Sequence, residues 1–383
     1  MTVRPMREDD REQVLALLQH AFNQPAWMVE RARTWPIDDF RVRVQDGQIL
    51  ATTAIRRFAH FFGGRSIPCA GISGVTVAAH ARGGRMAEAH VAECMREARE
   101  TMPISALWPA TVPLYRRLGY EYGLQRFQYK SPIRSLPRRE GTVEPWDDKD
   151  LHDVALAYRD YARRFNGMMD RPDTWWQMRI LPTFGDSAVH RYLVREAGQV
   201  TGSIVYTQEE PFHFDIEARD LFATTPVALR SLLAFVSRFG SMGRNFLWYG
   251  PPSEPIGLLL GEEHFEVAER GHMMFRLLDL PKAIEARGYP AHVRSSVTIL
   301  AEDALFPENS GPWRIAVSAG EGAAEGAGSA EIRTDSRTLA AIYTGFLAPS
   351  EARRIGLLDG PDAAVDALAA IFAGPDPWTA DFF

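Results

Sequence analysis

A short turn rich in glycine and arginine is the segment of this sequence best suited to bind a phosphate group. Val75-Thr76-Val77 is a β-branched run typical of a buried strand. Arg82-Gly83-Gly84-Arg85 follows, and the apolar spacing after residue 86 predicts an amphipathic helix. The start of such a helix presents backbone N–H groups and the positive end of its dipole, and both arginines add full charges. The sequence therefore predicts a diphosphate site in this turn.

Two common phosphate-binding motifs do not describe this turn. The Rossmann pattern G-x-G-x-x-G and the P-loop pattern both differ from it. It resembles motif A of the GNAT acetyltransferases, in which the loop holds the pyrophosphate of acetyl-CoA. Arg82 matches the first position of that motif and Ala87 the last, whereas Arg85 stands where the family usually has glycine. Taken alone, the segment is equally compatible with a surface loop before an ordinary helix.

The phenol of Tyr115 is a second group that could take part in chemistry. Ile104–Trp108 predicts another buried strand, and Val112–Tyr120 resembles the GNAT signature of a tyrosine on a short helix followed by a glycine and an aromatic residue. In that family the tyrosine protonates the departing CoA thiolate. A phenol has a pKa of roughly 10 and is therefore protonated at pH 7. Tyr120 is expected to pack at the start of the next strand. The alternative for Tyr115 is an aromatic core residue.

The chain around these two motifs predicts the elements that position them. Phe40–Val44 and Ile49–Ile55 flank Asp46-Gly47, a strong hairpin turn. Gly63-Gly64 turns the chain again toward the strand at Val75. Helix, antiparallel hairpins, strand, helix, strand is the GNAT order, and the resemblance implies a mixed sheet whose strands separate after Val75 to admit the cofactor. We assign residues 1–135 to this catalytic domain.

Residues 136–284 repeat a similar order of predicted elements. Residues 191–194 and 199–207 predict a hairpin, and Thr225-Pro226 opens a helix after a further strand. The turn before this helix has neither glycine nor arginine, and proline removes a donor N–H. We interpret this part as a second, degenerate GNAT domain that does not bind CoA. The alternative is an unrelated α/β domain.

Residues 285–383 predict a third domain. Ser296–Leu300, Trp313–Ser318 and Glu331–Thr334 have the composition of strands, and Ala363–Phe372 that of a helix. Gly320–Gly328 is rich in glycine and alanine and is expected to be a mobile hairpin tip. This stretch resembles a sterol-carrier-protein domain. That family implies a lipid tunnel, and a plain apolar core is the simpler alternative.

The expected fold class is therefore α/β (α+β), with two tandem GNAT-like mixed sheets, flanking helices and a C-terminal sterol-carrier-protein-like α+β domain. This order resembles the Eis (enhanced intracellular survival) family over essentially the whole chain, most specifically in Val75–Ala87, Leu114–Tyr120 and Met274–Pro290. The resemblance implies direct transfer from acetyl-CoA, in a ternary complex, to polyamine-like amines such as aminoglycosides, lysine side chains or peptides. It also implies a homohexamer.

The Eis resemblance further implies an unusual base, the C-terminal carboxylate, here on Phe383. A free α-carboxylate has a pKa of roughly 3.3–3.7, so it needs burial or a relaying water to accept a proton from an amine. The end of the chain carries Trp378, Phe382 and Phe383, which would expose much apolar surface if they were not docked. Docking is therefore expected. The alternative is a tail that only packs.

The predicted site residues fall into three groups. The catalytic residues are Tyr115 and Phe383. The residues predicted to bind acetyl-CoA lie in three segments of the first domain: Val75, Thr76, Val77, Arg82, Gly83, Gly84, Arg85, Met86, Ala87, Glu88, Ala110 and Thr111. The aromatic residues predicted to contact the acceptor are Phe22, Trp27 and Trp35, for which ordinary packing is an equally good interpretation.

Composition limits the remaining functions. The 383 residues carry a net charge of −6, which disfavours nucleic acid as a partner and favours cationic substrates. No apolar run reaches membrane-spanning length, and the first residues lack the apolar core of a signal peptide.

Cys69 and Cys94 provide no disulfide framework, so a cytoplasmic location is expected. The histidines show no metal-binding spacing, and no metal is expected. The rival function is a non-catalytic scaffold that binds CoA or a lipid, which Arg85 in place of glycine would favour.

Overall fold

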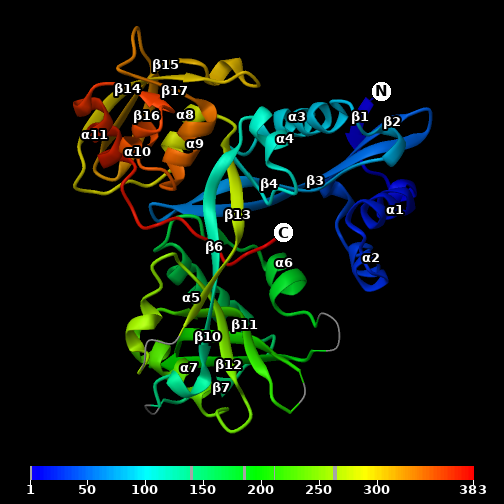
Figure 1. Ribbon diagram of the computed structural model, residues 1–383, viewed down its shortest axis with the longest axis vertical. Helices are drawn as coiled ribbons and strands as arrows, with labels where there is room; N and C mark the ends of the chain where they lie inside the picture. Colours follow the sequence, from blue (N-terminus) through cyan, green and yellow to red (C-terminus); the bar gives the residue numbers. More distant parts are fainter. Residues whose placement is uncertain (1, 139–140, 184–186, 211, 262–264) are drawn as a thin grey trace. The chain divides into compact units, whose positions relative to one another are not determined.

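The computed structural model describes residues 2–138, 141–183, 187–210, 212–261 and 265–383 (Figure 1). The chain forms two compact units. The first comprises Met1–Leu124, His272–Gly374 and Phe382–Phe383, and the second comprises Gln125–Gly271 and Pro375–Asp381. Strands β6 (Glu121–Pro132) and β13 (Glu266–Leu277) each run from one unit into the other.

The N-terminal part of the first unit is built around a mixed sheet. Its strand order is β1-β2-β3-β4-β5-β13, in which β4 and β5 are parallel and the other neighbours are antiparallel. The elements are β1 (Thr2–Pro5), η1 (Glu8–Asp10), α1 (Arg11–Phe22), α2 (Ala26–Ala32), η2 (Ile37–Asp39), β2 (Phe40–Gln45), β3 (Gln48–Phe62), β4 (Arg65–Val77), η3 (Ala79–Ala81), α3 (Met86–Arg99), β5 (Ile104–Leu107) and α4 (Val112–Arg117).

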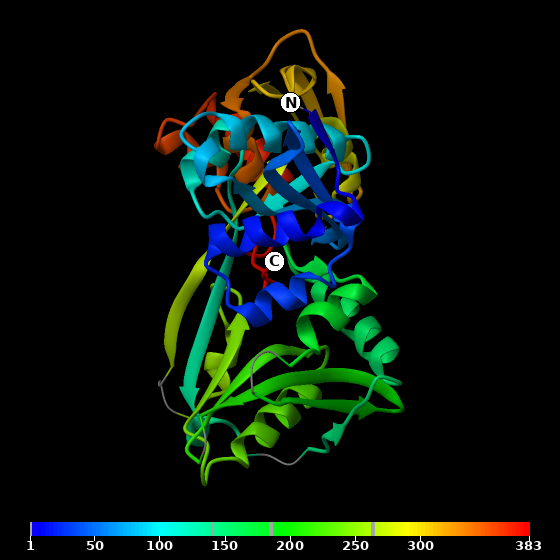
Figure 2. The same ribbon diagram turned by 90° about the vertical axis from the view of Figure 1, so that its right-hand side faces the viewer.

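Helices α1 and α3 cover opposite faces of this sheet. Successive residues of a strand point to opposite faces, and β3 shows the effect: Ala54 packs with Val14 and Leu18 of α1, whereas Ile55 packs with Val91 and Met95 of α3. Figure 2 shows α3 in cyan and α1 in dark blue on either side of strands β2–β4. The apolar spacing predicted for α3 is therefore confirmed by its buried face.

Strands β4 and β5 pair over a short stretch and then part. Among the described residues their register covers Cys69↔Ile104 to Gly71↔Ala106, while β4 continues to Val77 alongside β3. The β3–β4 register shifts between Thr52 and Ala54, opposite Gly74, which has a φ of 59°. This β-bulge adds one residue to β4 and increases its local twist. The carboxyl half of β4 is thereby directed away from β5.

The rest of the first unit is a five-stranded sheet with the order β16-β15-β14-β17-β18. Its strands and helices are α8 (Leu280–Ala286), β14 (Ser295–Glu302), η7 (Pro307–Asn309), β15 (Gly311–Ser318), β16 (Glu321–Gly326), β17 (Ile332–Asp335), α9 (Ser336–Thr344), α10 (Pro349–Arg354), β18 (Leu358–Asp359) and α11 (Asp362–Ile371). The strands expected around residues 296–300, 313–318 and 331–334 are confirmed by β14, β15 and β17.

The expectation of a mobile tip over Gly320–Gly328 is wrong. Ala319 and Gly320 alone make the turn, with φ values of 53° and 84°, and Glu321–Gly326 is strand β16, paired along β15 from Trp313 to Ser318. The hydrogen-bond ladder of a sheet uses backbone groups only, so small side chains do not prevent strand pairing.

The second unit contains another mixed sheet, with the order β6-β12-β11-β10-β9-β7. Strands β11 and β12 are parallel, as β4 and β5 are in the first unit. The elements other than β6 and β13 are η4 (Ile133–Ser135), β7 (Glu144–Pro145), α5 (Leu151–Ala162), β8 (Met169–Asp170), α6 (Asp173–Trp175), η5 (Trp176–Ile180), β9 (Val189–Glu196), β10 (Gln199–Glu209), β11 (Asp215–Ala223), α7 (Pro226–Ser237), β12 (Asn245–Gly250) and η6 (Pro255–Leu259). The predicted β9–β10 hairpin turns at Ala197-Gly198.

The start of α7 differs chemically from the start of α3. The hydroxyl of Thr225 accepts a hydrogen bond from the Ala228 N–H at 3.0 Å, and Pro226 at the first helical position has no N–H. A phosphate at this turn would find the Ala228 N–H already bonded and no N–H on Pro226. The expectation of a second GNAT-like fold with an altered phosphate turn agrees with this geometry.

Residues 375–381 pack into the second unit before the last two residues return to the first. Trp378 is buried, and its backbone N–H donates to the backbone carbonyl of Asn166 at 3.0 Å. Asp381 is also buried and accepts from Arg171 Nε at 3.0 Å and Trp175 Nε1 at 2.7 Å. Segment 375–381 of the tail is thus held by backbone and side-chain bonds within its own unit.

The mixed sheets with flanking helices agree with the expected fold class. Among the described residues, none of the helices combines the length and the apolar character needed to cross a lipid bilayer.

Candidate active site

The predicted phosphate turn leads directly into α3. Arg85 is the residue before the helix, and the first bond within the helix runs from the Ala89 N–H to the Arg85 carbonyl at 2.9 Å. The N–H groups of the three residues between them precede this bond, as in the first turn of any α-helix. Gly83 has a φ of 90°, a conformation that favours glycine. The turn therefore presents backbone donors at the positive end of a helix of 14 residues.

Arginine side chains surround this turn. Glu88 accepts hydrogen bonds from Arg85 Nη2 at 2.5 Å and from Arg117 Nε at 2.9 Å. These two arginines lower the pKa of Glu88, so its carboxylate is ionised at neutral pH. Arg82 is exposed, and its Nε donates to the Val77 carbonyl at 3.0 Å. With three guanidinium groups and one carboxylate, the turn carries an excess of positive charge.

The strand predicted to bind the cofactor contributes mainly its backbone. Val75 and Val77 are half-buried, and Val75 packs on the core cluster beneath α3. Thr76 is only 3% exposed, with its side chain turned into the protein. Because β4 has left β5 by this point, the edge of this segment on the β5 side is not covered by β5.

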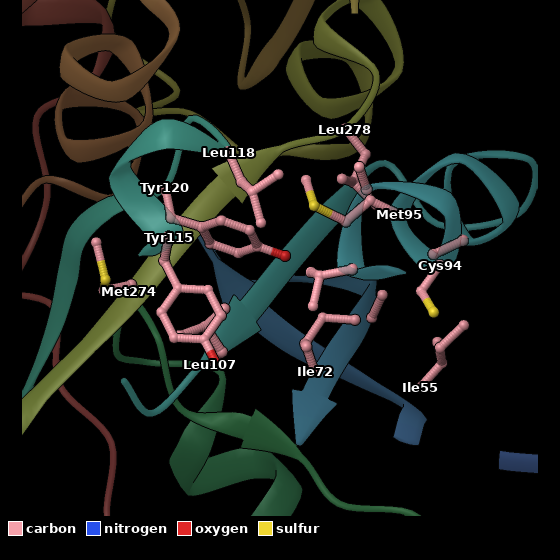
Figure 3. Packing of buried hydrophobic residues seen from close by; sticks show 14 of the residues in the cluster. Ile55, Ile72, Cys94, Met95, Leu107, Tyr115, Leu118, Tyr120, Met274 and Leu278 are labelled. Atoms are coloured by element: carbon pink, nitrogen blue, oxygen red, sulfur yellow. The ribbon is translucent and has the colours of Figure 1, made fainter. Parts of the chain in front are cut away.

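Tyr115 lies in the apolar cluster that packs against α3. It is 5% exposed, and its ring meets the ring of Tyr120 edge to face at 6.1 Å (Figure 3). Burial raises the pKa of the Tyr115 phenol to about 12, so the group is protonated at neutral pH. Cys94 is buried in the same cluster, as predicted, and both cysteines are free.

The residues near Tyr115 divide into buried and exposed ones. Tyr120 is fully buried at the entrance to β6, with its hydroxyl 2.7 Å from Ser105 Oγ, as expected for a packing residue. Ala110 and Thr111 are exposed in the connection from β5 to α4. His80 is exposed in η3, which agrees with a solvated histidine.

Phe383 docks on the sheet where β4 and β5 separate. Its ring lies 4.9 Å from that of Phe58 on β3, and it is 8% exposed. A Cβ built on Gly71 would lie 2.4 Å from the Phe58 ring and 3.0 Å from the Phe383 ring. Phe382 stays 53% exposed and packs on Trp108 with ring centroids 5.2 Å apart. The expected docking of the aromatic tail is confirmed for Phe383, whereas Phe382 remains largely exposed.

The three aromatic residues predicted to contact an acceptor have different surroundings. Phe22 and Trp27 are 44% and 48% exposed, at the end of α1 and the start of α2. Trp35 is half-buried, stacks on Phe40 at 6.1 Å and lies under the Arg56 guanidinium at 4.8 Å. Trp35 therefore has a packing role, whereas the other two present apolar surface to solvent.

Gly71 and Gly74 are features of the site that the sequence interpretation missed. Gly71 makes room for the Phe58 and Phe383 rings, and Gly74 forms the bulge that turns β4. Both glycines lie inside a strand, and a glycine in a strand interior is a known sign of a bulge or a close approach. That signal was present in the sequence beside Val75.

These groups share one side of the β4–β5 pair. Helix α3 follows β4 and helix α4 follows β5, and adjacent parallel strands end at the same edge of a sheet. A cationic helix start, an uncovered strand edge, a buried phenol and the docked tail of Phe382–Phe383 therefore belong to one region of the first unit. Such a region can bind an anionic ligand and supply a proton next to it.

Comparisons with known proteins decide between an enzyme and a binding scaffold. Residues 2–123 and 167–277 each match an acetyltransferase (GNAT) domain, and residues 280–380 match a sterol carrier protein domain. The chain is therefore an N-acetyltransferase with two tandem GNAT domains followed by a sterol carrier protein domain. Its co-substrate is therefore acetyl-CoA, and its acceptor is an amine.

Individual relatives agree with this assignment. A Streptomyces griseus protein named as an uncharacterized N-acetyltransferase is 25% identical to this acetyltransferase over 373 residues, covering 88% of this chain and 87% of the relative. A GCN5-related N-acetyltransferase from Anabaena variabilis is 27% identical, with a TM-score of 0.94 and complete coverage of both chains. Eis1 from Mycobacterium abscessus shares the fold, with a TM-score of 0.84, 19% identity and complete coverage of both chains.

The acetyltransferase shows little sign of a metal centre in the part of the chain that can be described. Across residues 2–138, 141–183, 187–210, 212–261 and 265–383, no three His, Cys, Asp or Glu side chains are grouped closely enough to hold a metal ion.

Proposed function

We propose that this acetyltransferase transfers the acetyl group of acetyl-CoA directly to an amine of a polyamine-like, cationic acceptor, with Tyr115 as general acid and the Phe383 carboxylate as base. The observation that carries the proposal is the placement of the α3 start, the buried Tyr115 phenol and the docked tail on one side of the β4–β5 pair.

Binding of acetyl-CoA would use the turn and the strand before it. The diphosphate is a dianion, and the turn from Arg82 to Glu88 offers backbone donors, a helix start and excess positive charge. The edge of Val75–Val77 that β5 leaves uncovered offers backbone groups to the pantetheine amides. Ala110 and Thr111, exposed beside α4, line the path toward Tyr115 in this proposal.

The reaction begins when the acceptor ammonium loses a proton, because only the neutral amine has a lone pair. In our proposal the Phe383 carboxylate takes this proton, directly or through water. The amine nitrogen then bonds to the thioester carbon. When the tetrahedral intermediate collapses, the carbon–sulfur bond breaks and Tyr115 donates its proton to the CoA thiolate. The nitrogen releases its second proton to water as the amide forms. Solvent then returns a proton to the phenolate and takes the proton from the Phe383 carboxyl.

A cationic acceptor fits the charge and surface of the protein. The net charge is −6, which attracts cations over a distance. Phe22 and Trp27 expose aromatic faces near the start of the first unit, and such faces attract ammonium groups. We propose these two residues as the acceptor contacts, together with Trp35, whose ring also packs on Phe40.

The Tyr115→Phe variant tests the acid role. Loss of the phenolic hydroxyl should lower kcat by about 10²-fold or more, because positioned proton donors contribute that much to a rate. The dissociation constant for CoA, measured by calorimetry, should stay within about twofold, since the ring still fills the cluster. An undiminished kcat would exclude Tyr115 as the acid.

A short C-terminal extension tests the base. Residues added after Phe383 move the carboxylate away from the docked ring, so acetyl transfer should be lost while CoA binding remains. A chain extended by the same residues before Thr2 is the matched control. Full activity of the C-terminally extended chain would contradict the carboxylate role.

The acceptor class can be tested by thiol release from acetyl-CoA with spermine, kanamycin and a lysine-containing peptide. We expect turnover to be highest with the polycationic small molecules. Turnover with none of the three would contradict the proposed acceptor class.

We also propose a homohexamer located in the cytoplasm, with domains at 1–135, 136–284 and 285–383. Light scattering of the purified protein would measure the assembly, and a mass other than six chains would exclude the hexamer.

A further inference from the structure

The turn that ends helix α4 is closely packed against a buried arginine. Gly119 has a φ of 82°, and a Cβ at this residue would lie 1.5 Å from Arg276 Nη1 and 2.6 Å from Arg276 Cζ. The guanidinium thus occupies the space where any other residue would have a side chain. The same turn is bonded to Tyr115, whose carbonyl accepts from the Leu118 and Tyr120 N–H groups, both at 3.0 Å. The Arg276 guanidinium therefore limits the positions open to the turn that follows Tyr115.

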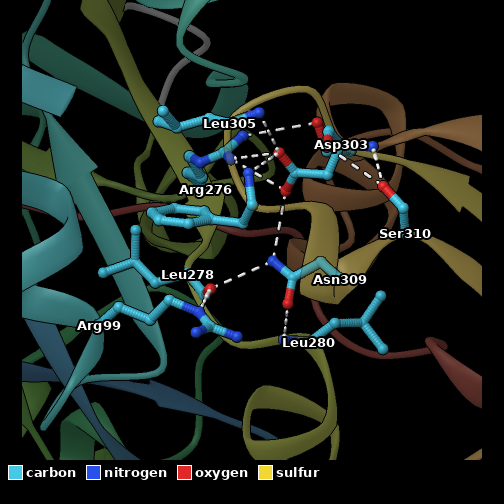
Figure 4. A network of polar contacts seen from close by, with 10 residues as sticks. Arg99, Arg276, Leu278, Leu280, Asp303, Leu305, Asn309 and Ser310 are labelled. Atoms are coloured by element: carbon cyan, nitrogen blue, oxygen red, sulfur yellow. Dashed lines mark hydrogen bonds and ion pairs between the residues drawn. The ribbon is translucent and has the colours of Figure 1, made fainter. Parts of the chain in front are cut away.

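Arg276 is held in place by the sterol carrier domain. Its side chain is fully buried, and Nη2 bonds both carboxylate oxygens of Asp303, at 2.7 and 2.9 Å (Figure 4). Asp303 in turn accepts the N–H groups of Leu305 at 3.0 Å and Phe306 at 2.9 Å. Arg276 Nη1 also lies 3.4 Å from Ser336 Oγ at the start of α9. Both bonds come from the single Nη2 nitrogen, and because charge-assisted hydrogen bonds are the stronger kind, they hold the guanidinium in position.

A second contact joins the sterol carrier domain to the same helix. Glu121, directly after the Gly119 turn, accepts Arg116 Nη2 of α4 at 2.7 Å. Its other oxygen accepts Arg337 Nη2 of α9, also at 2.7 Å. Burial alone would raise the pKa of Glu121, but the two arginines hold it below its ordinary value. The carboxylate is therefore an ionised bridge between α4 and α9.

We propose that Arg276 and Arg337 are positioning residues through which the sterol carrier domain fixes the orientation of Tyr115. This inference rests on the proposed role of Tyr115 as the general acid. Proton transfer requires hydrogen-bond reach, and a misplacement of about 1 Å can cost about 10²-fold in rate. Helix α4 has only six residues, too few for an isolated helix to be stable, so outside contacts must hold it. The sterol carrier domain thereby acts in catalysis without contacting substrate.

The decisive experiment combines Arg337→Met with Tyr115→Phe. Arg337 is 34% exposed, and Glu121 keeps Arg116 as a partner, so the variant should fold. In the parent protein we expect Arg337→Met to lower kcat by about 3- to 30-fold, with an unchanged dissociation constant for CoA. In the Tyr115→Phe background the same substitution should change kcat by less than about twofold, because the group that it positions is gone.

Arg276 gives an independent pair of variants. Arg276→Met removes the guanidinium from the Gly119 turn. It should lower kcat by a larger factor than it changes KM. Arg276→Lys keeps the charge beside Asp303 and should recover part of kcat. The matched control is Arg65→Met, which breaks the exposed 2.9 Å pair of Arg65 with Glu321 of the sterol carrier domain, away from α4, and should leave kcat unchanged.

The outcomes separate this inference from the proposed function. If Tyr115→Phe keeps full kcat, the acid role fails and this inference fails with it. If Tyr115→Phe loses activity but Arg337→Met has the same effect in both backgrounds, or none in either, only the positioning role is overturned. An equal loss of activity in Arg65→Met and Arg337→Met would also overturn the positioning role. The loss of any ion pair between the two domains would then be enough to lower the activity.

Discussion

At the scale of single residues, the site is defined by the chemistry that burial and charge give to ordinary side chains. Tyr115 is packed among apolar residues, and this burial raises its pKa to about 12, so it stays protonated to a higher pH than an exposed phenol. Arg85 and Arg117 bond to Glu88 and lower its pKa below the ordinary value. The first effect keeps the phenol a proton donor over a wider pH range, and the second leaves one negative charge against the three guanidinium groups of the turn.

The pKa of Tyr115 predicts the alkaline side of the pH profile. An acid must be protonated to act, so activity that depends on it falls as pH rises through its pKa. With a pKa of about 12 rather than 10, kcat should stay flat from pH 8 to about pH 10. Stopped-time assays across this range, with stability checked at each pH, would measure it. A twofold fall centred near pH 10 would contradict the burial of the phenol.

Arg82 should matter only to substrates that carry the diphosphate. Arg82→Gln removes a charge from the turn and should raise KM for acetyl-CoA by about tenfold, the value of one charge-assisted hydrogen bond. The kcat/KM for acetylpantetheine, which lacks the diphosphate, should not change. Comparison of the two substrates with one variant provides the control, and an equal loss with both would indicate a structural role for Arg82.

At the scale of elements, the behaviour of β4 decides what the site can bind. The strand is paired with β5 up to Gly71 and then turned by the bulge at Gly74. Bulges bend a strand and leave part of its edge unpaired, which is why they occur next to active sites. The same strand also accommodates the docked tail, because Gly71 has no side chain to exclude the Phe383 ring.

Gly71→Ala should separate tail docking from cofactor binding. The added methyl group would lie 2.4 Å from Phe58 and 3.0 Å from Phe383, so the tail ring must shift. We expect kcat to fall by about tenfold or more, and the dissociation constant for CoA to remain within about twofold. Gly326→Ala, whose Cβ would have no neighbour within 4 Å, is the control. Unchanged kcat in Gly71→Ala would argue that the position of the tail is unimportant.

At the scale of the whole molecule, the first unit joins the N-terminal acetyltransferase domain and the sterol carrier domain through one core. Met274, Leu278 and Phe306 belong to the same apolar cluster as Tyr115 and Met95. Phe306 and the partly buried Leu305 of the sterol carrier domain thus pack into a core formed mainly by the N-terminal domain. The predicted boundaries at 135 and 284 stay predictions of sequence organisation, and the compact units follow contacts instead.

The shared core predicts shared stability. Phe306→Ala removes a ring that is 3% exposed and lies under the Arg99 and Arg276 guanidinium groups. It should lower the free energy of unfolding by about 3–5 kcal/mol, as large-to-small core changes do. Hydrogen exchange should then show faster exchange in both α3 and β14. Loss of protection confined to residues 295–335 would show that the two domains unfold independently.

The sequence determined the local chemistry and the order of the elements. The strand at Val75–Val77, the amphipathic α3 and the tyrosine on α4 could be predicted because periodicity and turn residues act within a few positions of the chain. The tandem arrangement could be predicted because residues 136–284 repeat a similar order of local patterns. The mobile Gly/Ala-rich tip was predicted wrongly because composition does not show whether a neighbouring strand is available to pair with it.

Only the tertiary structure decided which distant residues control the site. Gly119 is part of a recognisable motif, but the sequence does not show that Arg276, 157 positions later, fills its missing side chain. The placement of the Phe383 ring on Gly71 and the bridge from Arg337 to Glu121 are equally invisible in local patterns. These contacts depend on long-range packing, in which residues far apart in the chain become neighbours only after the sheet and its helices have formed.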